Sequence, residues 1–239
     1  MIIVDHNHPT IKAIRSNPKF APHKYNGAYY YSVEIGKYFI PTIKTNRNWV
    51  TINVKSLAPR HAIVFAHNNV HLEWYKKYQG KDAILVCGMP ETAERLKIYG
   101  KTIYLPLSVD VEEVARFRTD KTKDVCFCGR NEKRTSAVPD DVPSLEGMPR
   151  DMLLQELAKY RRAYAVDRCA IEAKILGCEV LNYGYNYGVQ HPADFWQIID
   201  SRDAAKMLQE ALNQIDGTEE QKKSTQRKRK PAQKVPGKA

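Results

Sequence analysis

Short runs of apolar and β-branched residues alternate with stretches of helical periodicity through most of residues 1–212. This alternation is typical of βα units, in which helices cover the parallel strands that they connect. It argues against an all-helical or an all-β chain, and we therefore expect an α/β fold. The 239 residues are enough for one large domain or for two small ones, each with a core of its own.

The expected strands fall into two sets. The first set is 2–5, 49–54, 62–66, 83–87 and 103–106, with helices at 29–38, 72–77 and 91–99. A linking region at 111–124 precedes the second set, which has strands at 125–128, 142–145, 163–166 and 179–182 and helices at 151–161, 168–176 and 203–212. We expect two small Rossmann-like domains, residues 1–113 and 114–216, facing a cleft in which such sheets bind ligands.

Positive charge is concentrated at the C-terminus. The formal net charge is +11, and residues 217–239 alone contain eight Lys and Arg against two Glu. Because this segment has almost no apolar residues to bury, we expect a disordered basic tail. A nucleic acid or an anionic membrane surface would attract it, and simple solubilisation is the alternative.

The five cysteines occur without a paired CxxC pattern, which indicates reduced core thiols and argues against a zinc site. Asp5, His6 and His8 are of metal-ligand type, but no partner cluster accompanies them, and we expect no metal. The chain has neither an apolar run of about 18 residues nor a secretory signal pattern, and this predicts a cytoplasmic protein.

One glycine and three cations follow the expected strand 125–128. Gly129 would let the backbone approach a ligand at the end of a parallel strand. Arg130, Lys133 and Arg134 would neutralise a diphosphate bound there. The alternative is an ordinary basic turn after a strand. The position of this turn at the start of the second domain favours a binding role.

Glu172 lies in an apolar helical run that ends at Gly177 and passes into a strand. Ile171 and Ile175 recur at helical spacing and predict a buried face, while Glu172 falls near the positive end of the helix. A carboxylate there can accept hydrogen bonds from both hydroxyls of a ribose. The alternative is a solvated or salt-bridged helix residue.

Two further candidates lie in the first domain. His67 comes just after the strand 62–66, where it would accept a proton from an acceptor hydroxyl, and a surface-loop histidine is the alternative. Gly27 precedes the helix expected at 29–38, so that backbone amides would face a phosphate. An Asn-Gly pair is also an ordinary turn.

Taken in order, the segments from Ala62 to Leu212 resemble the two-domain GT-B architecture, in particular the retaining glycosyltransferases that use nucleotide-diphosphate sugars. Residues 101–110 are similar to the strand that ends in Pro and Val-Asp before the chain crosses to the donor domain. Residues 125–134 look like the turn that holds the donor diphosphate. Glu172, in Glu-Ala-Lys-Ile-Leu-Gly, looks like the ribose-binding glutamate. The resemblance implies sugar transfer from a nucleotide-diphosphate donor to a hydroxyl, without a further cofactor.

The chain departs from this pattern at one position that matters for catalysis. Where the family has a second glutamate, eight positions before the ribose-binding one, this chain has Tyr164, and Asp167 is the nearest carboxylate. Two function classes therefore stay open. One is a glycosyltransferase whose acceptor is modified DNA or a membrane-associated glycan or lipid. The other is a non-catalytic GT-B-like protein that binds nucleotide or nucleic acid.

Overall fold

The computed structural model describes residues 35, 36, 38, 47–50, 60–66, 72–183 and 191–228. Their strands are β1 (Asn48–Val50), β2 (His61–Ala66), β3 (Asp82–Cys87), β4 (Lys101–Tyr104), β5 (Lys123–Cys128), β6 (Tyr160–Ala165) and β7 (Glu179–Leu181). The α-helices are α3 (Pro90–Leu96), α4 (Val111–Ala115), α5 (Arg150–Leu157), α6 (Asp167–Ile175) and α7 (Ser201–Lys228). The 3-10 helices are η2 (Leu72–Tyr78), η3 (Asn131–Lys133) and η4 (Ala193–Phe195).

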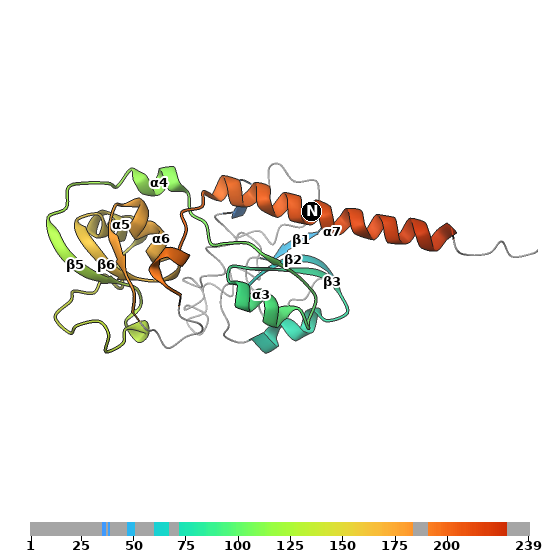
Figure 1. The fold of residues 1–239 in the computed structure, drawn as a ribbon, viewed down its shortest axis with the longest axis horizontal. Coiled ribbons are helices and arrows are strands. Elements are labelled where there is room, and N and C mark those ends of the chain that lie inside the picture. The colour runs from blue at the N-terminus through green and yellow to red at the C-terminus, as the bar shows by residue number, and fades with distance from the viewer. Residues whose placement is uncertain are drawn as a thin grey trace, which may run out of the picture.

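The strands form two parallel sheets that lie apart in the molecule (Figure 1). The order is β1-β2-β3-β4 in the first sheet and β5-β6-β7 in the second, and every neighbouring pair is parallel. The register aligns the carboxyl ends, because Ala66 pairs with Cys87 and Cys87 with Tyr104, while Cys128 pairs with Ala165. The predicted α/β class is confirmed.

Both faces of the first sheet are buried, which explains its nearly continuous apolar strands. Ile63 and Phe65 of β2 belong to the main hydrophobic cluster, whereas Ala62, Val64 and Ala66 belong to a second cluster on the other face. The main cluster also contains residues of the second sheet, of α6 and of α7. One apolar core therefore connects the two sheets.

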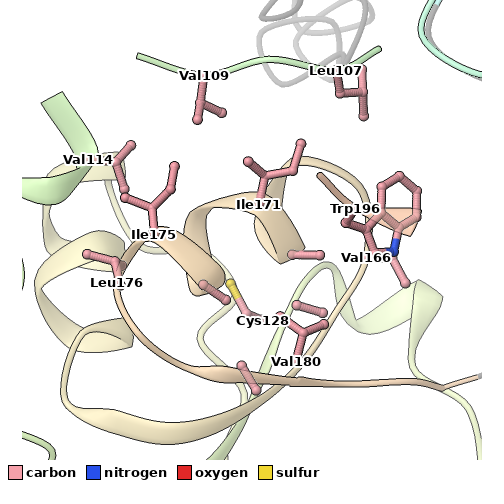
Figure 2. Packing of buried hydrophobic residues seen from close by; sticks show 14 of the residues in the cluster. Leu107, Val109, Val114, Cys128, Val166, Ile171, Ile175, Leu176, Val180 and Trp196 are labelled. Atoms are coloured by element: carbon pink, nitrogen blue, oxygen red, sulfur yellow. The ribbon is translucent and has the colours of Figure 1, made fainter. Parts of the chain in front are cut away.

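Within the described residues, two segments that cross between the sheets, one after β4 and one before α7, pair with each other. The Val109 amide donates to the Ile199 carbonyl at 3.2 Å, and the Ser201 amide donates to the Val109 carbonyl at 3.0 Å. In Figure 2, Leu107 and Val109 of the first crossing segment lie above Ile171 and Ile175 of α6. The first segment is thereby held against the helix that carries Glu172.

Helix α7 differs most from the sequence prediction. We expected a helix at 203–212 and a disordered tail from residue 217, but α7 continues through Lys228 (Figure 1). The reason is that Gln, Glu, Lys and Arg are good helix formers, and adding residues to an existing helix is much easier than starting one. Near residue 217 the helix is tied to the first sheet, because Arg47 forms ion pairs with Asp216 at 2.9 Å and with Asp82 at 2.8 Å.

Three predicted segments also need correction. The helix expected at 151–161 ends at Leu157, and Tyr160 already begins β6. The strand expected at 142–145 is a single bridge between Ser144 and Phe127. The linking region 111–124 contains α4 and the first residues of β5. The strand expected at 2–5 lies outside the described residues, as does most of the helix expected at 29–38.

Candidate functional site

The turn after β5 lies beside the start of α6 because β5 and β6 end at the same level. Gly129 follows the paired residue Cys128, and a Cβ atom at Gly129 would lie 3.2 Å from Phe127 Cζ and 3.5 Å from the Tyr183 hydroxyl. Such contacts are tighter than ordinary packing at the Phe127 ring. The Phe127 ring therefore leaves less room for a side chain than for glycine at this position.

An ion pair fastens this turn to α6. The Lys133 ammonium lies 2.8 Å from Asp167 Oδ2, and both side chains are mostly buried. Asp167 is the first residue of α6 and has a φ of 57°, a left-handed conformation that Asp tolerates better than most residues. Lys133 thus stands directly at the beginning of the helix that carries Glu172.

The other two predicted diphosphate ligands differ from each other. Arg130 is exposed at the start of the turn. The Arg134 guanidinium donates to the Val142 carbonyl at 3.0 Å and also to the Pro139 carbonyl, and it stacks over the Phe127 ring. Arg134 therefore stabilises the loop that follows η3 through its hydrogen bonds to these two carbonyls.

Glu172 is buried between two arginines. Its side chain is 2% exposed, and its Oε1 accepts from Arg150 Nη1 at 2.5 Å and from Arg168 Nε at 2.8 Å. Burial raises the pKa of the Glu172 carboxyl, and the charge and hydrogen bond of Arg168 oppose that rise. The salt-bridged alternative thus describes this residue, while a partner such as ribose would have to share or displace one of the arginines.

Sequence reasoning missed both arginines. Arg168 stands four positions before Glu172 on the same helix, and this spacing alone indicates an ion pair. Arg150 begins α5, and no local spacing connects it to Glu172. Their guanidinium groups add two positive charges to the edge at which Lys133 stands.

Tyr164 stands eight positions before Glu172, where the resemblance described above led us to expect a second glutamate. It lies on β6 and packs edge-on against Tyr183, with ring centroids 6.5 Å apart, and Tyr183 packs in the same way against Phe127 at 5.3 Å. An aromatic cluster therefore occupies this position. Asp167, the nearest carboxylate in the sequence, is held by Lys133.

The predicted residues of the first domain lie outside the described residues. They are His67, Gly27 and the group Asp5, His6 and His8. Ala66, the residue before His67 in the sequence, is the last residue of β2 and pairs with Cys87.

A pocket of about 250 Å³ lies between the two sheets. Its walls come from the ends of β3 and β4, from the crossing segment after β4, from α6 and from the segment around η4; they are Gly88, Tyr104, Pro106, Leu107, Ile171, Phe195, Trp196 and Gln197. Ile171 precedes Glu172 in the chain, and the pocket therefore borders the same helix as the basic residues. Figure 2 labels three of the wall residues, Leu107, Ile171 and Trp196, among the buried hydrophobic side chains.

Two negative findings concern the described part of the chain. Within it, no three His, Cys, Asp or Glu side chains gather closely enough to hold a metal ion. None of the described helices is both long enough and apolar enough to cross a membrane. Comparisons of the whole chain with protein-family models, curated proteins and solved structures found no match.

Proposed function

We propose that this chain is a glycosyltransferase that binds a nucleotide-diphosphate sugar at the carboxyl edge of β5, β6 and β7. The observation that carries the proposal is the ion pair between Lys133 and Asp167, at 2.8 Å. It joins the turn that begins at Gly129 to the helix of Glu172, so that cations and a carboxylate border one site. Ligands of parallel sheets bind at such an edge, where strand order and connections leave a crevice.

Each residue has a role in this proposal. Gly129 keeps the turn close to the Phe127 ring, Arg130 and Lys133 bind the diphosphate, and Arg134 shapes the loop beside them. When the bond between the sugar carbon and the diphosphate oxygen breaks, negative charge builds on the diphosphate, and these cations stabilise it. The acceptor hydroxyl forms the new bond to that carbon and loses its proton, and we assign His67 as the base that accepts this proton. We also assign Gly27, in the first domain, to the phosphate site.

Glu172 would hold the ribose. Because both arginines bind Oε1, the carboxylate has a set orientation before a ligand arrives. A ribose hydroxyl that donates to the carboxylate would also bring the donor phosphates toward Arg150 and Arg168. Arginine binds phosphate oxygens through pairs of parallel hydrogen bonds, and the two residues are therefore suited to follow the ligand.

A panel of UDP-, GDP- and ADP-sugars tests the proposal. Calorimetry would measure binding of each donor, and mass spectrometry would follow its hydrolysis. We expect saturable binding of one donor that is strongly weakened in Glu172→Gln. The matched control is Glu156→Gln. Glu156 lies on α5, near the opposite end of the second sheet, and it also pairs with two cations, Lys123 and Lys159. Binding of no donor, or equal loss in both variants, would refute the proposal.

One observation favours the second function class, a protein that binds the donor and has lost turnover. Tyr164 occupies the position of the family's second glutamate and is packed against Tyr183. The two classes share the donor site and differ only in chemistry. Saturable donor binding without hydrolysis or transfer, over hours and at high protein concentration, would establish the binding protein and exclude the transferase.

The basic C-terminal segment, residues 217–239, directs the choice of acceptor. We propose that it draws the protein to a polyanion, either modified DNA or a membrane that carries an acceptor glycan or lipid. Binding to a DNA duplex and to vesicles with anionic lipid, measured at two salt concentrations, separates the two. Deletion of residues 229–239, which leaves α7 whole, should weaken the true interaction and leave donor binding unchanged.

A further inference from the structure

The amino edge of the first sheet, at which β2, β3 and β4 begin, carries a row of cations. Arg60 directly precedes β2, Lys81 directly precedes β3, and Lys101 is the first residue of β4. These three parallel strands are neighbours in the sheet. Because neighbouring strands lie about 4.8 Å apart, the row extends over about 10 Å of the edge.

The helices that lead into these strands bring further cations to the same edge. Lys76 and Lys77 lie in the last turn of η2, shortly before β3, and Lys97 follows α3, shortly before β4. Burial, and then the positive charge of Lys81, lower the pKa of Lys77 to about 8. The cations of this edge are therefore close enough to repel each other, and a negatively charged partner would offset that repulsion.

Two carboxylates of the amino edge are paired with cations. Asp82, the first residue of β3, lies 2.8 Å from Arg47 Nη1 and 3.0 Å from His61 Nδ1. Glu94, in the last turn of α3, pairs with the lysine three positions after it. The sequence from 35 to 72, which includes β1 and β2, contains no Asp or Glu. Positive charge therefore prevails at this edge.

Helix α7 passes the first sheet and continues beyond it (Figure 1). Arg47 connects the helix to the amino edge, because its second ion pair, at 2.9 Å, is with Asp216 of α7. The rest of the helix, residues 217–228, contains four Lys or Arg against two Glu, and a helical segment of this length is about 18 Å long. The basic end of α7 therefore begins next to the basic edge.

We propose that the amino edge of the first sheet and the end of α7 form one surface that binds the phosphate backbone of duplex DNA. Lys and Arg bind backbone phosphates without reading the bases. Each DNA strand has one phosphate per about 3.4 Å of helix axis, so the row of cations at the edge matches about three phosphates. The inference narrows the polyanion of the proposed function to DNA and rests on that proposal for the role of residues 217–239. It does not require the donor site.

An anionic membrane would be attracted by the same charges, but the surface lacks an apolar face. A helix that lies on a bilayer buries apolar side chains between the lipids. Residues 216–228 contain no Val, Ile, Leu, Met, Phe, Tyr or Trp. Among the described residues at the amino edge, Ile98 is the large apolar residue with the greatest exposure, at 67%. Charge without an apolar face fits DNA better than a bilayer.

Fluorescence anisotropy with a labelled DNA duplex and the full chain, without a nucleotide-sugar, tests this surface. The logarithm of the binding constant should fall linearly with the logarithm of the salt concentration between about 50 and 200 mM. In the triple variant Arg60→Gln, Lys81→Gln, Lys101→Gln the slope should become less steep by about one for each lost phosphate contact, about three in all. Two duplexes of different sequence should have the same Kd.

The matched control is the triple variant Arg116→Gln, Arg161→Gln, Lys206→Gln. It removes the same charge from exposed residues of α4, of β6 and of the first turns of α7, and it should keep the wild-type slope. Arg60 is exposed, and Arg60→Gln alone should reduce the slope by about one, which keeps the test valid even if the first triple variant fails to fold.

Three results would overturn the proposal. They are no duplex binding by the wild type, the same slope in the edge variants and the control, and tighter binding to vesicles of phosphatidylcholine and phosphatidylserine than to the duplex. Donor binding without DNA binding would refute only this surface, whereas DNA binding without donor binding would refute only the proposed transferase.

Discussion

Replacement of Glu172 by glutamine is the sharpest test of how the candidate site is held together. The change removes one negative charge and keeps the size of the side chain, and it leaves Arg150 and Arg168 facing each other across an amide. Breaking a buried ion pair by removing one partner costs about 3–5 kcal/mol. The arginine side chains are 24% and 21% exposed and keep some contact with water, which places the expected loss near the lower end, about 3 kcal/mol.

Urea unfolding followed by circular dichroism would measure this loss. For a chain of this length, about 3 kcal/mol corresponds to a decrease in Tm of roughly 6–12 °C. Glu156→Gln removes an equally charged side chain from two lysines that are 45% and 43% exposed, and the expected loss there is below about 1 kcal/mol. A loss for Glu172→Gln as small as that of Glu156→Gln would refute the reasoning.

A double-mutant cycle separates the ion pair from other effects of the substitution. If Glu172 stabilises the fold through Arg168, the variant with both Glu172→Gln and Arg168→Gln should be more stable than the sum of the single losses predicts. We expect a coupling free energy of about 1–2 kcal/mol, as for residues in direct contact. Simple additivity would show that the two side chains stabilise the protein independently.

Three further predictions concern a partly buried lysine, a glycine with a positive φ and an ion-paired aspartate. Burial lowers the pKa of Lys77 to about 8 from 10.5, so the unfolded chain binds more protons than the folded one between these pH values, and the stability of the wild type rises with pH there. Lys77→Met should therefore raise the free energy of unfolding by about 1 kcal/mol at pH 7 and by much less at pH 10.5. An equal gain at the two pH values would contradict this. Gly177 ends α6 with a φ of 80°, and Gly177→Ala should lower the free energy of unfolding by about 1 kcal/mol in urea titrations, whereas no change would show that the helix end rearranges. Asp167→Asn frees Lys133 from its carboxylate and should tighten nucleoside-diphosphate binding about threefold by calorimetry, while weaker binding would place Lys133 away from the phosphates.

Much of the fold follows from local patterns. The strands β2 and β3 and the second half of β5 are short apolar runs, and α6 carries a helical period with a glycine just after its end, so that local sequence locates them. The end of α5 was missed because Tyr160 and Arg161 continue a plausible helical pattern, and pairing with β5 places them in a strand instead. The extent of α7 depends on the turns before it and on Arg47, which is distant in sequence.

The candidate site was predictable where its residues are neighbours in sequence. Gly129 was proposed because it follows a recognisable strand, and Glu172 because it lies in an apolar helical run that ends at Gly177. Arg150 was not found, since its contact with Glu172 depends on how α5 packs and no spacing rule links the two. The structural role of Arg134 was equally hidden, because its acceptors are loop carbonyls. Tertiary packing determines both.

The most direct test of the proposed donor site is the calorimetric Kd of the tightest-binding nucleotide-diphosphate sugar for three proteins: the wild type, Arg130→Ala and Arg95→Ala. Arg130 is exposed beside Gly129, and Arg95, an exposed arginine on α3, serves as the surface control. The account predicts a Kd at least about tenfold higher in Arg130→Ala, as for one lost charged hydrogen bond, and an unchanged Kd in Arg95→Ala. Equal affinities in all three proteins, or no binding by the wild type, would contradict it.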